Sequence, residues 1–208
     1  MTRFCSIEGA RGWLAWTVVL SHVAYASGIY IKGIGPFLGR TGVASVSVFM
    51  IISGFVITHL IIQKRESYSI YIFRRFMRIF PLFALTCAIG FFCIPLAATV
   101  SDNVTWGDKI WLGSLAQEYY TQTEYFWPNF WAHLTMLHGA ISTKILPAGP
   151  YAFNAPAWSL SLEWQFYLVA PAVIAAGKNY IASLASLMII AVLCTLYDFQ
   201  VFGTFPFR

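Results

Sequence analysis

Long apolar runs separated by short polar segments form the main pattern along this chain of 208 residues. No charged residue occurs in 12–31, 41–62 or 79–101, and crossing a hydrocarbon core takes roughly 20 apolar residues. The runs 157–177 and 180–197 are similarly apolar, and a less regular one covers 125–145. The pattern therefore predicts about six transmembrane helices joined by short connections.

The composition supports the same interpretation. Hydrophobic residues make up 59% of the chain and charged residues 10%, whereas soluble domains average about 25% charged residues. No internal repeat or second soluble stretch is found, so residues 1–208 are expected to form a single all-α domain, a polytopic helical bundle in the membrane. The cysteines have neither paired nor zinc-type spacing, which predicts packing roles and no bound metal: Cys5, Cys87, Cys93 and Cys194.

The segment 63–81 carries five basic residues and a single acidic residue, Glu66. Loops rich in lysine and arginine stay on the cytoplasmic side, so this loop and the N-terminus are predicted to be cytoplasmic. The net charge of +5 thus reflects topology, and no nucleic-acid partner is expected. A cleavable secretory signal ending near Ala26 is the alternative for the N-terminus, but the apolar run continues to Ile31, which favours a retained helix.

Arg11 and His22 are the first candidate functional residues. In a helix their eleven-residue step is about three turns, so both side chains lie within roughly 20° of one face and about 16 Å apart. This spacing predicts a cation near one membrane surface and an imidazole near mid-depth. Ionisable groups inside a membrane are costly and mark functional sites by default, although a histidine hydrogen-bonded to a neighbouring helix is the alternative.

Three arginines, Arg74, Arg75 and Arg78, precede the run 79–101 and would share one side of a helix. Like charges at this spacing repel, and an anion would relieve the repulsion. Guanidinium groups suit phosphate, so the anion is expected to be a phosphate of a cytosolic donor or of a lipid headgroup. A simple topology anchor is the alternative.

Glu163 stands near the start of an apolar run, four residues from Ser159 and from Tyr167. In a helix this spacing flanks the carboxylate with two hydroxyl groups. The carboxylate either favours the positive end of the helix dipole or orients a partner such as a histidine. Two further histidines, His133 and His138, are five residues apart, so they would not share a helical face and are predicted to be polar packing or interface residues and not a metal pair.

Four segments, in this order along the chain, resemble signatures of acyltransferase family 3, membrane proteins that O-acylate surface carbohydrates and related molecules. Arg11 and His22 are separated by ten residues, Ser53-Gly54-Phe55 lies in the second segment, and Arg75 and Arg78 have a spacing of three in the third. The fourth is AWSLSLEWQFYLVAP, in which the matching residues are Trp158, Ser159, Ser161, Glu163, Phe166, Tyr167 and Pro171. Each segment alone is a weak signal, whereas four matches in the same order across residues 7–171 are specific for the family.

The resemblance implies transfer of an acyl group, expected to be acetyl, from cytoplasmic acyl-CoA to a hydroxyl of a cell-surface or secreted carbohydrate. His22 and Glu163 would be the catalytic residues, with His22 acting as a general base or a transient acyl carrier. Arg11, Arg75 and Arg78 would bind or orient the donor, and the supporting residues would be Ser53, Trp158, Ser159 and Tyr167. Acyl-CoA is then a co-substrate, no permanently bound cofactor is expected, and the location would be a bacterial inner or plasma membrane.

Members of the family usually have about ten membrane segments, against about six counted in this chain. The resemblance therefore covers the N-terminal part of the family fold, and the domain is expected to be incomplete at its C-terminus. A truncated, non-catalytic membrane protein is the first alternative hypothesis. A transporter is the second, because intramembrane histidine and glutamate residues also occur in proton pathways.

Overall fold

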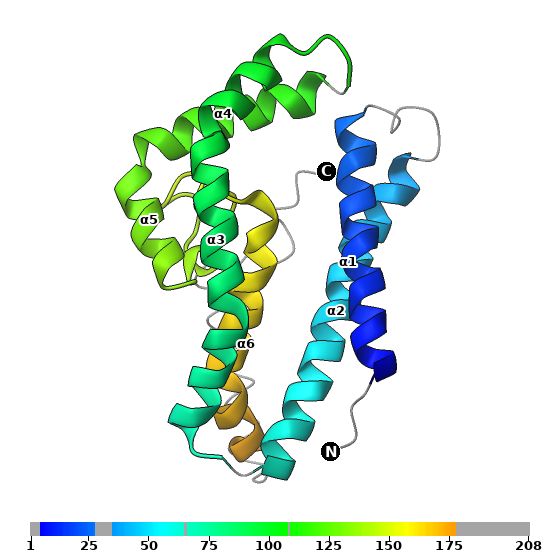
Figure 1. Ribbon diagram of the computed structural model, residues 1–208, viewed down its shortest axis with the longest axis vertical. Helices are drawn as coiled ribbons and strands as arrows, with labels where there is room; N and C mark the ends of the chain where they lie inside the picture. Colours follow the sequence, from blue (N-terminus) through cyan, green and yellow to red (C-terminus); the bar gives the residue numbers. More distant parts are fainter. Residues whose placement is uncertain (1–4, 28–34, 65, 108, 178–208) are drawn as a thin grey trace. The chain divides into compact units, whose positions relative to one another are not determined.

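The computed structural model describes residues 5–27, 35–64, 66–107 and 109–177 of the chain. These residues are mainly helical and contain no strand (Figure 1), in the order α1 (Cys5–Ala26), α2 (Gly35–Lys64), α3 (Tyr68–Asn103), α4 (Lys109–Glu124), α5 (Phe126–Leu134), the 3₁₀ turns η2 (His138–Ala140) and η3 (Ala155–Ala157), and α6 (Trp158–Ala176). The predicted all-α class is confirmed. The predicted segment 180–197 lies outside the described residues.

Three described stretches are long and apolar enough to cross a membrane: Ala44–Lys64 of α2, the whole of α3, and Ala155–Ala176, which contains α6. Large apolar side chains are exposed along α3, and Phe92 has 79% of its surface accessible. A helix that is apolar around its whole circumference is typical of a membrane span. Together these helices confirm an all-helical membrane protein.

The less regular run at 125–145 does not form one crossing helix, so that part of the prediction is wrong. α5 ends at Leu134 after nine residues, which is about 14 Å. Met136 then has a φ of 55°, in the left-handed region, where an α-helix of L-residues cannot continue. The apolar run is therefore split into a short helix and a loop.

The described residues form two compact units, each of which is described by itself. The first contains the described residues within 1–56 and 94–120, and the second contains those within 57–93 and 121–208. The boundary falls within α2, within α3 and within α4.

Small residues form the contact between α1 and α2 in the first unit. A Cβ atom added to Gly42 would lie 2.4 Å from the Oγ atom of Ser21, so the two helices approach closely at this point. Ser45 and Ala24 are also buried. Small residues permit such close helix contacts in membranes, and the small-residue run 41–62 therefore packs as its sequence predicts, at least at Gly42 and Ser45.

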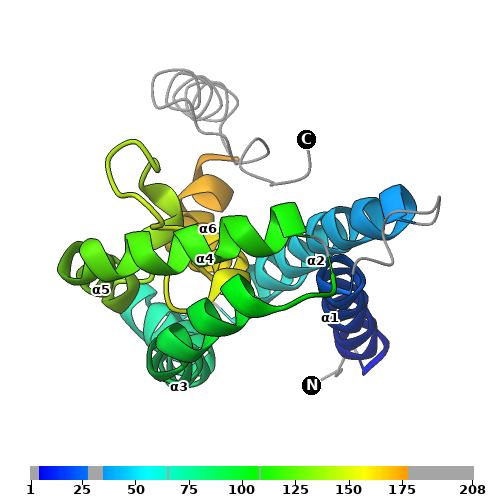
Figure 2. The same cartoon turned by 90° about the horizontal axis from the view of Figure 1, so that it is seen from above.

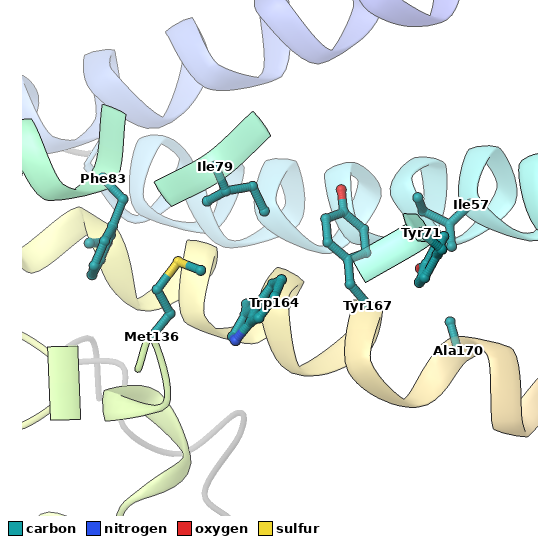
Figure 3. Packing of buried hydrophobic residues seen from close by; sticks show 9 residues of the cluster. Ile57, Tyr71, Ile79, Phe83, Met136, Trp164, Tyr167 and Ala170 are labelled. Carbon is teal, nitrogen blue, oxygen red and sulfur yellow. The ribbon is translucent and has the colours of Figure 1, made fainter. Parts of the chain in front are cut away.

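The core of the second unit lies between α3 and α6 (Figure 3). It combines Ile79 and Phe83 of α3 with Trp164 and Ala170 of α6, and Met136 fills the space beside them. The other members are Ile57, Tyr71, Ala157 and Tyr167. Met136 is completely buried, so the loop after α5 is an integral part of this core.

α5 runs alongside α3 in the opposite direction. The ring of Phe126, at the start of α5, lies 5.2 Å from that of Phe91, whereas His133, near its end, lies 6.2 Å from the ring of Phe83. Both views place α5 beside α3 and lead the following loop into α6 (Figure 1, Figure 2). The loop thus returns to the first turn of α6 and fixes where that helix begins.

Hydrogen bonds fasten this loop to the neighbouring helices. The hydroxyl of Ser161 donates to the carbonyl of Met136 at 2.7 Å and accepts from the amide of Gly139 at 3.0 Å. Farther along, the side-chain amide of Asn154 donates to the hydroxyl of Thr86 at 3.0 Å. These contacts tie the loop to α6 at one end and to α3 at the other.

Substitution of Gly90 by alanine tests the packing of this loop on α3. A Cβ atom at Gly90 would lie 1.6 Å from the carbonyl oxygen of Phe153, whereas at Gly113 of α4 it would meet nothing within 4 Å. At an open helical position, alanine is favoured over glycine by roughly 0.8–1 kcal/mol. Gly113→Ala is therefore expected to raise the apparent melting temperature in detergent and Gly90→Ala to lower it. Equal increases for both variants would contradict the observed packing.

Candidate functional site

His22 lies on α1 in the first unit, and its ring is oriented by its own helix. The Nδ1 atom lies 2.8 Å from the carbonyl oxygen of Val18, one turn earlier. Because a carbonyl only accepts hydrogen bonds, Nδ1 carries the proton in this arrangement, and in the neutral ring Nε2 then carries the lone pair. The ring is half-buried, so His22 presents a basic nitrogen with a fixed tautomer.

Arg11 belongs to the same continuous helix as His22, as the sequence predicts. Its guanidinium carbon lies 4.4 Å from the centre of the Phe49 ring of α2. This is well within the range of a cation–π interaction, which extends to about 6 Å. Ser53, also on α2 and in the same unit, is buried with 1% of its surface exposed.

The three arginines at the start of α3 have different environments. Arg74 is exposed and pairs with Glu66, which also lies 3.7 Å from the ammonium group of Lys64. Among the described residues, neither Arg75 nor Arg78 forms an ion pair with a carboxylate. Arg75 and Arg78, the pair predicted from its spacing of three, thus differ from Arg74 because no carboxylate lies beside them among the described residues.

The guanidinium group of Arg75 lies over the rings of two tyrosines. Its central carbon is 5.7 Å from the ring centre of Tyr71, one turn earlier on α3, and 5.8 Å from that of Tyr167 on α6. Its Nε atom is buried and has no hydrogen-bond partner among the described residues. Arg78 is exposed. Arg75 is therefore held by aromatic faces and not by a counter-ion.

Glu163 is 97% buried on α6 and accepts a short hydrogen bond from the hydroxyl of Tyr167. This confirms the predicted hydroxyl neighbour on one side. The hydroxyl of Ser159 instead donates to the carbonyl of Pro156 at 3.1 Å, because Ser159 lies in the first turn of α6, where the preceding 3₁₀ turn supplies a nearby carbonyl. Trp158 is the first residue of α6.

The predicted site residues fall into two groups. Arg11, His22 and Ser53 lie in the first unit, and the second unit contains the others: Arg75, Arg78, Trp158, Ser159, Glu163 and Tyr167. Within the second unit the structure brings Arg75, Tyr167 and Glu163 together. Tyr71 was not predicted, although its four-residue spacing from Arg75 was a readable signal for a shared helical face.

His133 and His138 form a stack that their spacing did not predict. Their ring centres are 3.9 Å apart with an angle of 8° between the planes, and the ring of Phe83 is parallel to both. The argument from a helical face failed because the helix ends at Leu134, between the two residues. Both rings are buried, which agrees with the predicted packing role. Parallel stacked rings direct their nitrogen lone pairs side by side, and this arrangement does not suit one shared metal ion.

Burial sets the charge state of this pair, which lies outside the candidate membrane-spanning helices. Desolvation lowers the pKa of His133 to about 4 and that of His138 to about 3, against an ordinary value of 6.5. Both imidazoles are therefore neutral at pH 7, which permits the close stack.

The lowered pKa values predict how acid affects the fold. Because each folded pKa lies below 6.5, the contribution to stability is fully present above about pH 6.5 and is lost as the pH falls toward 4 and then 3. His138→Phe keeps an aromatic ring in the stack and removes one titrating group. Its apparent melting temperature is expected to fall less between pH 7 and pH 5 than that of the unaltered protein. An equal fall in apparent melting temperature for the two proteins would contradict the lowered pKa of His138.

Comparison with known proteins gives the family of this chain. A family model described as an acyltransferase domain matches residues 5–207. The chain is also 28% identical over 174 residues to the acyltransferase MdmB of Streptomyces mycarofaciens. That alignment covers 82% of this chain and 39% of the relative, so the chain spans well under half the length of the protein it matches. No solved structure matches. The chain belongs to the family defined by this acyltransferase domain.

Proposed function

We propose that this protein transfers an acyl group, expected to be acetyl, from acyl-CoA to a hydroxyl of a cell-surface or secreted carbohydrate such as lipopolysaccharide. Membership of the acyltransferase family supports acyl transfer in general. The observation that carries the proposal is the orientation of His22, whose Nε2 lone pair is left available by the hydrogen bond from Nδ1 to Val18. The proposed location is a bacterial inner membrane with a cytoplasmic N-terminus, supported by the basic segment 63–81.

His22 is the proposed general base. Its Nε2 atom takes the proton of the acceptor hydroxyl while the hydroxyl oxygen attacks the thioester carbonyl. The new C–O bond forms, the C–S bond breaks, and the proton returns from Nε2 to the departing thiolate of coenzyme A. The same nitrogen could instead carry the acyl group transiently before the hydroxyl attacks, so both routes place the chemistry at Nε2.

Arg75 and Arg78 are the proposed donor-binding residues, with Arg11 in a similar role from the first unit. Guanidinium groups bind phosphate oxygens through two parallel hydrogen bonds, and the donor carries several phosphates. Glu66 already neutralises Arg74, whereas the described residues provide no such carboxylate for Arg75 or Arg78. The charge environment thus favours these two arginines as the anion-binding pair.

Replacing His22 by asparagine tests the catalytic role. An asparagine side chain can donate to the Val18 carbonyl as Nδ1 does, but it offers no basic nitrogen. A base that acts in the transition state contributes about 10²- to 10⁴-fold, and His22→Asn should lose at least the lower factor in kcat for transfer from labelled acetyl-CoA. Undiminished transfer by a folded variant would contradict the assignment. Proton-coupled flux without acyl transfer would instead support the transporter alternative.

Replacing Arg75 by alanine tests the donor role. Hydrogen bonds to a charged group contribute roughly 1.5–3 kcal/mol, so the KM for acyl-CoA should rise about 10-fold or more in Arg75→Ala. Arg74→Gln is the matched control, because an exposed ion pair such as that with Glu66 contributes little and Arg74 is assigned no role in donor binding. Equal increases in KM for both variants would show that general positive charge, and not Arg75, attracts the donor.

A further inference from the structure

The contact between Arg75 and Tyr167 extends to a buried carboxylate. Figure 3 shows Tyr71 and Tyr167 approaching the same cluster from α3 and α6. The Arg75 guanidinium lies 5.7 Å from the first ring and 5.8 Å from the second, and the hydroxyl of Tyr167 donates to Glu163. Guanidinium, phenol and carboxylate therefore form one continuous chain of contacts across the two helices.

A phenol that donates a hydrogen bond to a carboxylate becomes richer in electrons. Hydrogen-bonded groups polarise one another, and the effect is larger where the dielectric is low. The face of an aromatic ring attracts a cation because it carries negative charge, so a more electron-rich ring attracts the cation more strongly. Glu163, with 3% of its surface exposed, is in the dry environment that this effect requires.

Holding an arginine by aromatic faces has a different consequence from pairing it with an acid. A carboxylate partner would occupy the N–H donors of the guanidinium group and cancel its charge, as Glu66 does for Arg74. Ring faces fix the plane of the group and leave its N–H donors for another acceptor. The Nε atom of Arg75 is buried and has no acceptor among the described residues, which agrees with this arrangement.

We propose that Glu163 is a positioning residue that acts through Tyr167 to hold Arg75 ready for a phosphate group. The inference rests on the proposed function, in which that phosphate belongs to the acyl-CoA donor. In this role the carboxylate of Glu163 serves donor binding and not the histidine. Tyr71, Tyr167 and Glu163 together form a clamp for Arg75. The two tyrosine rings contact the guanidinium group, and Glu163 contacts Tyr167.

The test is a cycle of variants in which coenzyme A is the binding probe. The full chain is purified into nanodiscs of phosphatidylcholine, and the affinity for coenzyme A is measured together with KM and kcat for acetyl-CoA. Glu163→Gln replaces the carboxyl group by a neutral amide at nearly constant shape, and Tyr167→Phe keeps the ring but removes the hydrogen bond. Each should weaken binding about 3-fold, and Tyr167→Leu, which removes the ring, about 10-fold, with kcat little changed.

The decisive comparison repeats Glu163→Gln in an Arg75→Ala background. If Glu163 acts through Arg75, its replacement has no further effect on the affinity once the guanidinium group is gone. Tyr68→Phe is the matched control for the tyrosine variants, because Tyr68 is exposed on the same helix and its hydroxyl donates to the carbonyl of Leu168 at 3.1 Å. Its affinity for coenzyme A should match that of the unaltered protein.

Three results would overturn the inference. The first is a loss of kcat in Glu163→Gln while its affinity for coenzyme A is unchanged. The second is that Glu163→Gln lowers this affinity equally in the presence and in the absence of Arg75. The third is an unchanged coenzyme A affinity in Arg75→Ala, which removes the donor role itself and so the proposed function of Arg75.

Nanodiscs containing phosphatidylglycerol separate the two sources of phosphate, because a clamp for lipid headgroups would retain this lipid in an Arg75-dependent manner. If Glu163→Gln does not fold, Tyr167→Phe carries the same cycle.

Discussion

A polar group in apolar surroundings is costly unless it is paired, and this cost explains how several of the chemical groups are held. His22 uses the carbonyl of Val18 in its own helix, and Ser161 bridges the carbonyl of Met136 and the amide of Gly139. Arg75 lies over the rings of Tyr71 and Tyr167. In each case a neutral partner fixes the orientation of the group.

Neutral partners also preserve reactivity. An imidazole paired through Nδ1 with a carbonyl keeps the lone pair of Nε2, and a guanidinium group between aromatic rings keeps its charge and its donors. The arginine next in sequence shows the contrast, because Arg74 is paired with Glu66. The same short segment thus contains one arginine used in a surface ion pair and another for which the described residues provide no carboxylate.

The sequence was sufficient where local periodicity decides the outcome. Apolar runs predicted the three described stretches that can span a membrane, and four-residue spacing predicted the contact of Glu163 with Tyr167. It was insufficient where distant parts of the chain decide. The break after Leu134 depends on a left-handed Met136 whose carbonyl is held by Ser161, 25 residues later. The stack of His133 with His138 follows from that break and could not be read from spacing.

The proposed activity is the movement of an acyl group from coenzyme A to a hydroxyl. The most direct measurement places the purified protein in sealed vesicles and follows radiolabelled acetyl-CoA added to the side that carries the 63–81 loop, with a carbohydrate acceptor on the other side. The account predicts alkali-labile label on the acceptor and one free thiol for each acetyl group transferred. Label that remains on coenzyme A, although coenzyme A binds, would contradict it.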